Sequence, residues 1–219
     1  MKIKGVIFDL DGLLIDTEKL YQRFWIEAAK QCGYKMTKEQ SLQLRSLDKN
    51  LAKNLLTEWF GKDFSYQKTK EIRIKLMNDY IEKNGINAKE GAAELASYLK
   101  ENGYKTAIAT ATNYERTNYH LKLAGLRDYF ENIICASNLE HGKPYPDVYL
   151  YACRKLELEP CECLALEDSP NGIKSSYSAG CITVCVPDSG EPENEINPFV
   201  NYHAKSLNDV IDLIKNMSV

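Results

Sequence analysis

Several residue types and patterns that mark common classes of protein are scarce in this sequence. Only three of its 219 residues are histidine, which argues against a zinc site. No uncharged apolar stretch reaches the ~18 residues of a membrane-spanning helix. The first apolar run is interrupted by Asp9, which is not typical of a signal peptide. We therefore expect a soluble, cytoplasmic protein without a membrane partner.

An excess of positive charge is also absent. Lys and Arg together number 28 and Asp and Glu number 31, so the net charge is −3. Nucleic-acid binding as a main task needs cations against the phosphate backbone, so we expect no nucleic-acid partner, although the total leaves room for a local basic patch. The sequence leaves the oligomeric state open, and our expectation is a monomer.

The sequence also lacks paired cysteine motifs. The seven cysteines are odd in number, and most lie in apolar runs, as Cys135 and Cys185 do, which predicts reduced and buried thiols. Cys161 and Cys163 stand too close together for a zinc knuckle and have no second pair to complete four ligands. We expect neither a disulfide nor a metal at these positions.

The first part of the chain is predicted to be helical after one short strand. The strand covers 3–9, and apolar residues then recur every four residues from Leu20 to Cys32, which indicates an amphipathic helix. Thr37 with Gln40 forms a possible capping box, and Ser65 is a plausible helix N-cap. The helices expected in this part cover 17–32, 37–45, 48–60 and 66–83.

After residue 85 strands and helices alternate, which indicates βαβ units and a parallel sheet. The expected strands cover 105–110, 132–136, 162–167 and 181–186, the expected helices 90–102, 114–124, 146–156, 170–179 and 206–217, and a surface loop 187–201. We predict an α/β fold, a doubly wound (Rossmann-like) parallel sheet with an inserted helical cap. The core would comprise 1–16 and 86–219 and the cap 17–85. Ligands of such sheets bind beyond the carboxyl ends of the strands, so the insert should cover the site.

Two carboxylates follow the first strand. Asp9 and Asp11 stand two residues apart, so strand periodicity turns both toward one small volume. Their repulsion, about 4 kcal/mol at 4 Å and an effective dielectric constant of 20, requires a cation, a proton or a metal nearby. The purely structural alternative is a turn at Asp11 and Gly12, with Asp16 capping the next helix.

The ends of the other predicted strands also carry polar groups. Thr110 and Ala111 precede a helix and offer a hydroxyl and backbone N–H groups to an anionic oxygen, or the segment serves only as a helix cap. Lys143 is held by the prolines that follow it, whereas a lone loop lysine is usually solvated. Glu167 and Asp168 precede a helix, whose N-terminus favours acids on its own.

Taken in order along the chain, these residues favour phosphoryl transfer. Carboxylate oxygens suit Mg²⁺, which binds through one or two carboxylates together with substrate phosphate. A nucleophilic carboxylate, a second acid, a metal, a lysine and a hydroxyl are the groups that this chemistry needs.

This pattern resembles the haloacid dehalogenase-like superfamily of phosphotransferases. It is most similar to the branch whose helical cap follows the first strand, which includes sugar-phosphate phosphatases and β-phosphoglucomutase, and the resemblance runs from about residue 3 to 186. It implies a phosphatase that takes a small phosphorylated metabolite and uses Mg²⁺ and an aspartyl-phosphate.

The resemblance also implies a role for each site residue. Asp9 matches the nucleophile and Asp11 the general acid and base, whose backbone carbonyl is expected on the metal. Thr110, Ala111 and Lys143 would bind phosphate, and Lys143 would also stabilise charge. The implied metal ligands are Asp9, Asp168 and Glu167. Gly12 would allow a sharp turn, and Asp16 would have a structural role.

Differences between this chain and particular members of the superfamily narrow the range of expected activities. The second acid, Asp11, disfavours dehalogenation and phosphonoacetaldehyde hydrolysis, because those relatives lack it. The mutases carry a histidine where this chain has Tyr21 and a cap arginine near the place of Lys49, which favours a plain phosphatase. A phosphosugar mutase of the β-phosphoglucomutase type is the alternative, and a non-enzymatic binding protein is a third reading. Tyr21, Arg45 and Lys49 are candidate cap contacts, with ordinary helix surface as the other interpretation.

Overall fold

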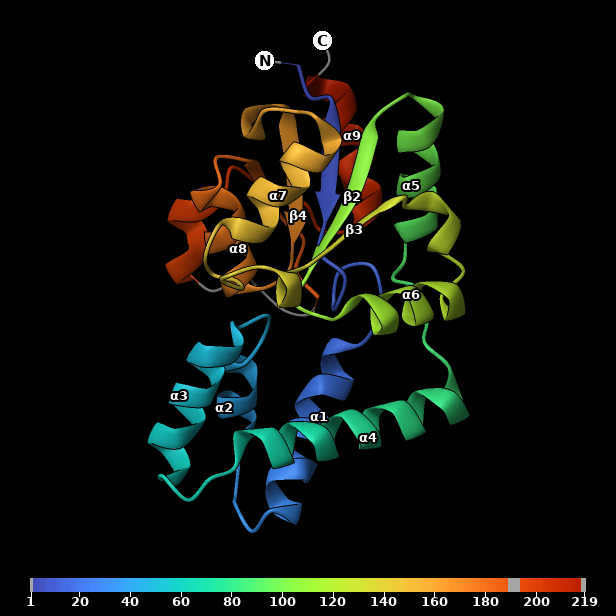
Figure 1. Cartoon of the computed structure of the whole chain (residues 1–219). Coiled ribbons are helices and arrows are strands. Elements are labelled where there is room, and N and C mark those ends of the chain that lie inside the picture. The colour runs from blue at the N-terminus through green and yellow to red at the C-terminus, as the bar shows by residue number, and fades with distance from the viewer. Residues whose placement is uncertain (1, 189–193, 218–219) are drawn as a thin grey trace.

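A parallel β-sheet forms the centre of the fold (Figure 1). The computed structural model describes residues 2–188 and 194–217, and within them the sheet has six strands in the order β3-β2-β1-β4-β5-β6. Every pair of neighbouring strands is parallel. The strands are β1 (Gly5–Phe8), β2 (Lys105–Thr110), β3 (Asn132–Cys135), β4 (Cys163–Glu167), β5 (Ile182–Cys185) and β6 (Tyr202–His203). The doubly wound α/β fold predicted from the sequence is confirmed.

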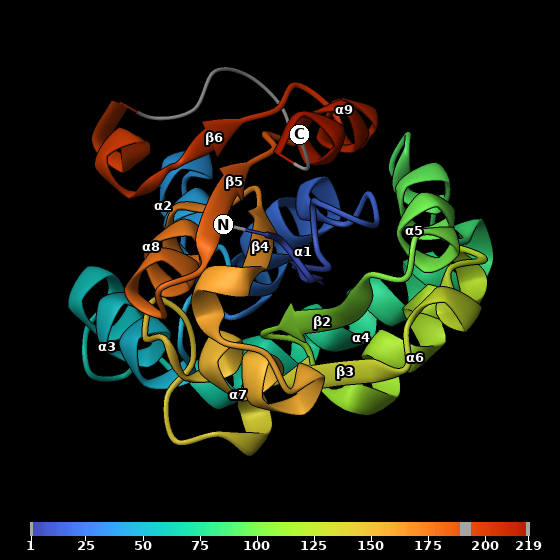
Figure 2. The same ribbon diagram turned by 90° about the horizontal axis from the view of Figure 1, so that it is seen from above.

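Helices cover both faces of this sheet, and four further helices lie together beyond one end of it (Figures 1 and 2). The four are α1 (Glu18–Gln31), α2 (Lys38–Gln43), α3 (Lys49–Phe60) and α4 (Tyr66–Asn84). The others are α5 (Ala92–Glu101), α6 (Tyr114–Leu123), α7 (Asp147–Leu156), α8 (Pro170–Ser178) and α9 (Leu207–Met217). Within the described part of the chain, none of the helices combines the length and the apolar character needed to span a membrane.

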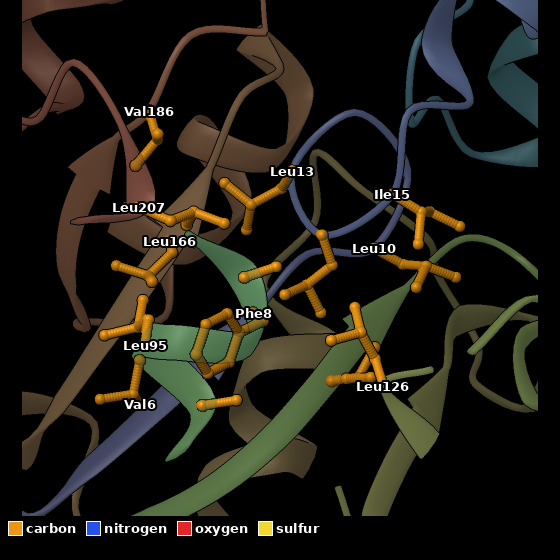
Figure 3. Close-up of a cluster of buried hydrophobic side chains, with 14 of the residues drawn as sticks. Val6, Phe8, Leu10, Leu13, Ile15, Leu95, Leu126, Leu166, Val186 and Leu207 are labelled. Atoms are coloured by element: carbon orange, nitrogen blue, oxygen red, sulfur yellow. The ribbon is translucent and has the colours of Figure 1, made fainter. Parts of the chain in front are cut away.

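Strand periodicity divides the core between the two faces of the sheet. In β1, Val6 and Phe8 belong to a buried cluster that α5 and α9 cover, and Figure 3 shows side chains of this cluster around Phe8. Ile7, between them, belongs to a second buried cluster, which contains residues of α7. Because β1 is buried on both faces, its sequence is continuously apolar, as is typical of a central parallel strand.

The layer formed by α1–α4 has a small apolar core of its own. Trp25, Leu44 and Leu56 lie in this cluster, while Met77 and Ile81 of α4 belong to the large cluster of the sheet. The layer is therefore packed both internally and against the rest of the fold.

The helix ends agree largely with the sequence prediction. Thr37 and Gln40 form the expected capping box of α2, and the Ser65 hydroxyl caps α4 by accepting from the N–H of Lys68. The structural alternative in which Asp16 caps the first helix is not observed, because Thr17 occupies the N-cap of α1 and no side chain caps it. Among the cysteines, five are buried, Cys32 is half-buried and Cys161 is exposed, and all seven are unpaired thiols.

The segment predicted as a loop over 187–201 is partly structured. Its residues 189–193 lie outside the described part of the chain. Asn194–Phe199 form a 3₁₀ helix, and Ile196 is buried against Ile173 and Cys185. The prolines and polar residues of this segment obscured its apolar contacts, which also include those of Phe199 and Val200. Strand β6 was not predicted because it comprises two exposed residues at the sheet edge.

Candidate active site

Residues from the ends of several strands meet at the side of the sheet that faces α1–α4. Asp9 follows β1, Thr110 ends β2 and Glu167 ends β4, and Lys143 reaches them from the loop before α7. All four side chains are buried, with Thr110, Lys143 and Glu167 fully so. This convergence follows from the parallel sheet, whose strands all point their carboxyl ends to the same side.

Lys143 lies at the centre of the group. Its Nζ donates to Asp9 Oδ1 and Glu167 Oε1, at 2.5 Å each, and to the carbonyl of Ala109 at 3.0 Å. Burial by itself lowers the pKa of Lys143, but the Asp9 and Glu167 carboxylates outweigh it and raise the pKa above its usual value. The lysine is therefore a fixed cation next to Asp9, and not the solvated side chain of a typical loop.

Glu167 is occupied by protein donors. Its Oε1 also accepts from the Tyr149 hydroxyl at 2.6 Å, and its Oε2 accepts from the hydroxyl of Ser169 at 3.1 Å. A Cβ atom on Gly172 would overlap the Glu167 carboxylate, so only glycine leaves room for it. These contacts suit a residue that holds Lys143 in place.

Three carboxylates form a buried acidic group. Asp9, Glu167 and Asp168 each place an oxygen within 4.8 Å of the others. Asp9 Oδ2 and Asp168 Oδ1 are buried and have no hydrogen-bond partner among the residues described. Burial raises the pKa of Asp9 against the effect of Lys143, and it raises the pKa of Asp168 to about 8 against the effect of Arg45. Two unpartnered carboxylate oxygens within one buried acidic group fit a divalent cation that prefers oxygen ligands.

The Asp11 side chain lies outside this acidic group and faces the helical layer. Its Oδ1 accepts from the Thr17 hydroxyl and its Oδ2 from the Thr112 hydroxyl, both at 2.7 Å. The turn between the two aspartates is tight, because Gly12 has a φ of +93° and a Cβ atom there would overlap Asp168 Oδ2. The carboxylate of Asp11 is thus oriented toward the cavity, and only its backbone carbonyl is left as the metal ligand that the sequence suggests.

The loop after β2 is also fixed by a side chain. The Thr110 hydroxyl accepts from the backbone N–H of Thr112 at 3.0 Å, and the Asn113 side chain caps α6 by accepting from the N–H of Arg116. Ala111 is exposed between them, in the wall of a cavity. Both alternatives considered for this segment, an anion site and a helix cap, are compatible with its geometry.

A cavity of about 410 Å³ lies between the strand ends and the helices α1–α4. Asp11 and Lys143 line it from the sheet, while Tyr21, Arg45 and Lys49 line it from the helical layer. The three candidate cap contacts of the sequence analysis therefore share one cavity with the strand-end residues.

Two of these three contacts are engaged with other residues. Arg45 bonds to the carboxylate of Asp168 and lies 3.2 Å from Glu18 Oε1, and the Tyr21 hydroxyl is 3.0 Å from the Thr112 hydroxyl. Arg45 therefore connects the helical layer to the acidic group. Lys49 is exposed at the start of α3.

Sequence reasoning missed several residues of this site. Glu18, Asp48 and Arg73 line the cavity, and Tyr149 supports Glu167 from the interior of α7. Arg73 had a detectable signal: Thr69, Met77 and Ile81, its neighbours at intervals of four in α4, are all buried. An arginine within a buried helical stripe is unusual.

Comparisons with known proteins agree with this geometry. The family model described as haloacid dehalogenase-like hydrolase matches residues 3–180. Hexitol phosphatase A of Escherichia coli (strain K12) is 33% identical over 186 residues, which cover 85% of this chain and 84% of that protein.

Solved structures show the same fold. A hydrolase from Pseudomonas syringae matches with a TM-score of 0.87 and 21% identity, over 99% of this chain and 100% of that one. The β-phosphoglucomutase of Clostridium difficile matches with a TM-score of 0.80 and 23% identity, over 98% of each chain. At this level of identity the two structures bear on the fold alone.

Proposed function

The chain belongs to the haloacid dehalogenase-like hydrolase family and is a phosphoric monoester hydrolase, and on this premise we propose that it is a Mg²⁺-dependent phosphatase for a small phosphorylated carbohydrate or a related metabolite. The observation that carries the proposal is the pair of Asp9 and Lys143: one oxygen of a buried carboxylate is held by a buried cation, and the other has no partner among the described residues. The name of hexitol phosphatase A, a relative, supports the substrate class.

Asp9 Oδ2, Asp168 Oδ1 and the backbone carbonyl of Asp11 would hold the metal. The unpartnered state of the two carboxylate oxygens supports this assignment. When bound, Mg²⁺ supplies positive charge to the phosphoryl oxygens and favours the ionised form of the acids around it. Glu167, which already accepts hydrogen bonds from three residues, would act mainly by positioning Lys143.

In the first step a carboxylate oxygen of Asp9 forms a bond to phosphorus while the bond from phosphorus to the ester oxygen breaks. Lys143 offsets the charge on the phosphoryl oxygens, and Thr110 with the N–H of Ala111 binds them. Asp11 gives its proton to the departing alcohol, and an aspartyl-phosphate remains on Asp9.

In the second step Asp11, now ionised, takes a proton from water as the water oxygen attacks phosphorus. The bond from phosphorus to Asp9 breaks, which releases phosphate, regenerates the carboxylate and returns Asp11 to its protonated state. The hydroxyls of Thr17 and Thr112 keep the Asp11 carboxylate pointed at the cavity in both steps.

We assign residues 17–85 as the cap that selects the substrate, with 1–16 and 86–219 as the catalytic core. The cavity has walls from both parts, so closure of the cap over a bound ester would exclude bulk water.

Tyr21 favours hydrolysis over the mutase reaction. Its hydroxyl is hydrogen-bonded to Thr112, and its pKa is raised above its usual value by burial and by Asp11, so it is a poor proton shuttle at neutral pH. Incubation with β-glucose 1-phosphate separates the two activities. We expect inorganic phosphate to appear; faster formation of glucose 6-phosphate would identify a mutase.

The central test replaces Asp9 by Asn and assays a panel of hexitol and sugar phosphates with Mg²⁺. Asp9→Asn should release no phosphate from any ester that the wild type cleaves. Asp63→Asn, at an exposed position on the helical layer, is the matched control and should retain full activity. Equal phosphate release by wild type and Asp9→Asn would overturn the assignment.

A further inference from the structure

The guanidinium of Arg73 is buried in the cavity wall and has no acidic partner among the described residues. Arg73 is 5% exposed, and its Nε and Nη1 atoms have no hydrogen-bond partner among the residues that the structure describes. It lies over the rings of Tyr21 and Trp25, at 4.8 and 4.9 Å from their centroids. No ion pair found within 2–188 and 194–217 includes it.

Such a charge requires a partner. Burial lowers the pKa of Arg73 from its usual value, yet a guanidinium stays protonated in proteins. Buried charges are normally paired, because an unpaired one loses its hydration without compensation. Two aromatic faces offset part of this cost. The Arg73 side chain lines the cavity, so a ligand bound there is the natural source of the missing acceptor.

Three other cations line the same cavity and none of them has an ion-pair partner among the described residues. They are Lys49 at the start of α3, Lys70 on α4 and Arg116 on α6. Burial lowers the pKa of Lys70 first, and Arg73, Arg116 and Lys49 lower it further, so these charges repel one another. The repulsion is relieved when an anion binds among them.

Among the described residues, the four acids that line the cavity form no ion pair with these cations, and the first of them, Asp11, accepts from the Thr17 and Thr112 hydroxyls. Glu18 faces Arg45, and Asp48 accepts hydrogen bonds from backbone N–H groups. Glu71, which also lines the cavity, accepts from Gln67 and forms no ion pair within the described residues. The positive side of the cavity is thus separate from the acidic group at Asp9 and Asp168.

We propose that the substrate carries a second anionic group, a phosphate or a carboxylate, which Arg73, Arg116 and Lys70 bind while the scissile phosphate lies at Asp9. This inference rests on the proposed function and narrows its substrate class to doubly anionic phosphate esters. The planar fork of an arginine matches the oxygens of either anion in bidentate fashion. Because Arg73 comes from α4 of the helical layer and Arg116 from α6, which follows β2, the second anion would also join these two parts of the fold.

Binding to the inactive Asp9→Asn protein tests the proposal without turnover. Three probes share one skeleton and differ at carbon 1: glucose 6-phosphate, glucose 1,6-bisphosphate and 6-phosphogluconate. By isothermal titration calorimetry with Mg²⁺, one or both doubly anionic probes should bind at least ~10-fold more tightly than glucose 6-phosphate. Preference for the bisphosphate identifies a phosphate site, and preference for 6-phosphogluconate a carboxylate site. Equal binding of all three, or none, overturns the proposal.

Variants locate the site. Arg73→Met in the same background should weaken binding of the preferred probe ~10- to 100-fold and that of glucose 6-phosphate less than ~3-fold, and Arg73→Lys should restore part of the loss. Arg116→Met, at a half-buried position that does not threaten folding, should weaken the same probe. Arg23→Met is the matched control, because Arg23 also lies over aromatic rings but is exposed outside the cavity.

The outcomes separate this inference from the proposed function. If the preferred probe binds in an Arg73-dependent way but the wild type releases no phosphate from any ester, the second anion site is retained and the phosphatase assignment fails. If the wild type hydrolyses esters and Arg73→Met affects all three probes equally, the phosphatase assignment is retained and the second anion site fails.

Discussion

The Asp48 side chain accepts a hydrogen bond from the backbone N–H of Gly142 at 2.9 Å, and its own backbone N–H donates to the carbonyl of Lys143 at 2.7 Å. Asp48 also caps α3, with Oδ1 accepting from Asn50 and Leu51. Asp48 of the helical layer thus caps a helix and is hydrogen-bonded to the loop that carries Lys143. Burial raises the pKa of Asp48, but these N–H groups outweigh it and the net pKa is below its usual value.

Two substitutions at Asp48 separate its two roles. In Asp48→Asn the side-chain oxygen can still cap α3, but the amide NH₂ group then faces the N–H of Gly142 and cannot accept its hydrogen bond. Asp48→Ala loses both the cap and the hydrogen bond with Gly142. We expect kcat/KM to fall about 10-fold in both variants, since a charged hydrogen bond contributes about 1.5–3 kcal/mol. Only Asp48→Ala should also lose the cap, about 1 kcal/mol, and melt a few degrees lower.

Ser65→Ala is the control for this pair, because Ser65 also caps a helix of the same layer, α4, from an exposed position. It should lower the melting temperature as a lost cap does and leave kcat/KM unchanged. Wild-type kcat/KM in Asp48→Asn would show that the contact with Gly142 has no part in the reaction.

Gly172 offers a test of the support under Lys143. Helix propensity alone predicts that Ala is better than Gly in α8 by about 1 kcal/mol. A Cβ atom at this position would overlap the Glu167 carboxylate, so we expect destabilisation of about 1–3 kcal/mol and a loss of activity as Lys143 shifts. Thermal melts and phosphatase assays check both effects. Ser178→Ala, exposed on the same helix, should be neutral, and a more stable Gly172→Ala would contradict the predicted overlap.

The part of the site at the strand ends was predictable because one geometrical rule brings it together. Asp9, Thr110, Lys143 and Asp168 lie at or after carboxyl ends of parallel strands, and such ends converge whatever the details of packing. Burial of Lys143 was not predictable, because its partners Asp9 and Glu167 are 134 and 24 residues away in the chain.

The cap side of the cavity depends on tertiary contacts that no local pattern specifies. Asp48 is only the first residue of the helix predicted over 48–60, and its bond to Gly142 spans 94 residues. Arg45 has the surroundings of a surface residue in the sequence, yet it reaches Asp168 and Glu18. Helical periodicity indicates which residues are buried, but not which part of the chain lies opposite them.

Glu18 makes the stability of the protein depend on pH. Burial raises its pKa from 4.5 to about 7, against the effect of Arg45. A carboxyl whose pKa is higher in the folded state stabilises the fold when protonated, so the free energy of unfolding should fall as the pH rises from about 4.5 to 7. The loss is at most about 3 kcal/mol, and Asp168 adds a loss of the same sign.

Glu18→Gln removes this titration. In urea unfolding between pH 4.5 and 8, the decline in free energy of unfolding should be smaller in Glu18→Gln than in the wild type, by up to about 3 kcal/mol. Glu58→Gln, at an exposed position on α3, should follow the wild-type curve. Parallel curves for Glu18→Gln and the wild type would place the Glu18 pKa near that of a free carboxyl.

Mg²⁺ should stabilise the folded protein through Asp9 and Asp168. At 100 times its dissociation constant, a ligand that binds only the folded state adds about 2.7 kcal/mol, which for a chain of this size raises the melting temperature by roughly 5–10 °C. Thermal melts of chelator-treated protein with and without Mg²⁺ measure this shift. Because the pKa of Asp168 is about 8 and metal binding needs the carboxylate, the shift should grow as the pH rises toward 8.5. Asp168→Asn should abolish the rise in melting temperature, and the control Asp63→Asn should retain it. An equal rise in the wild type and in Asp168→Asn would show that Asp168 Oδ1 is not a ligand of the metal and would place the metal elsewhere.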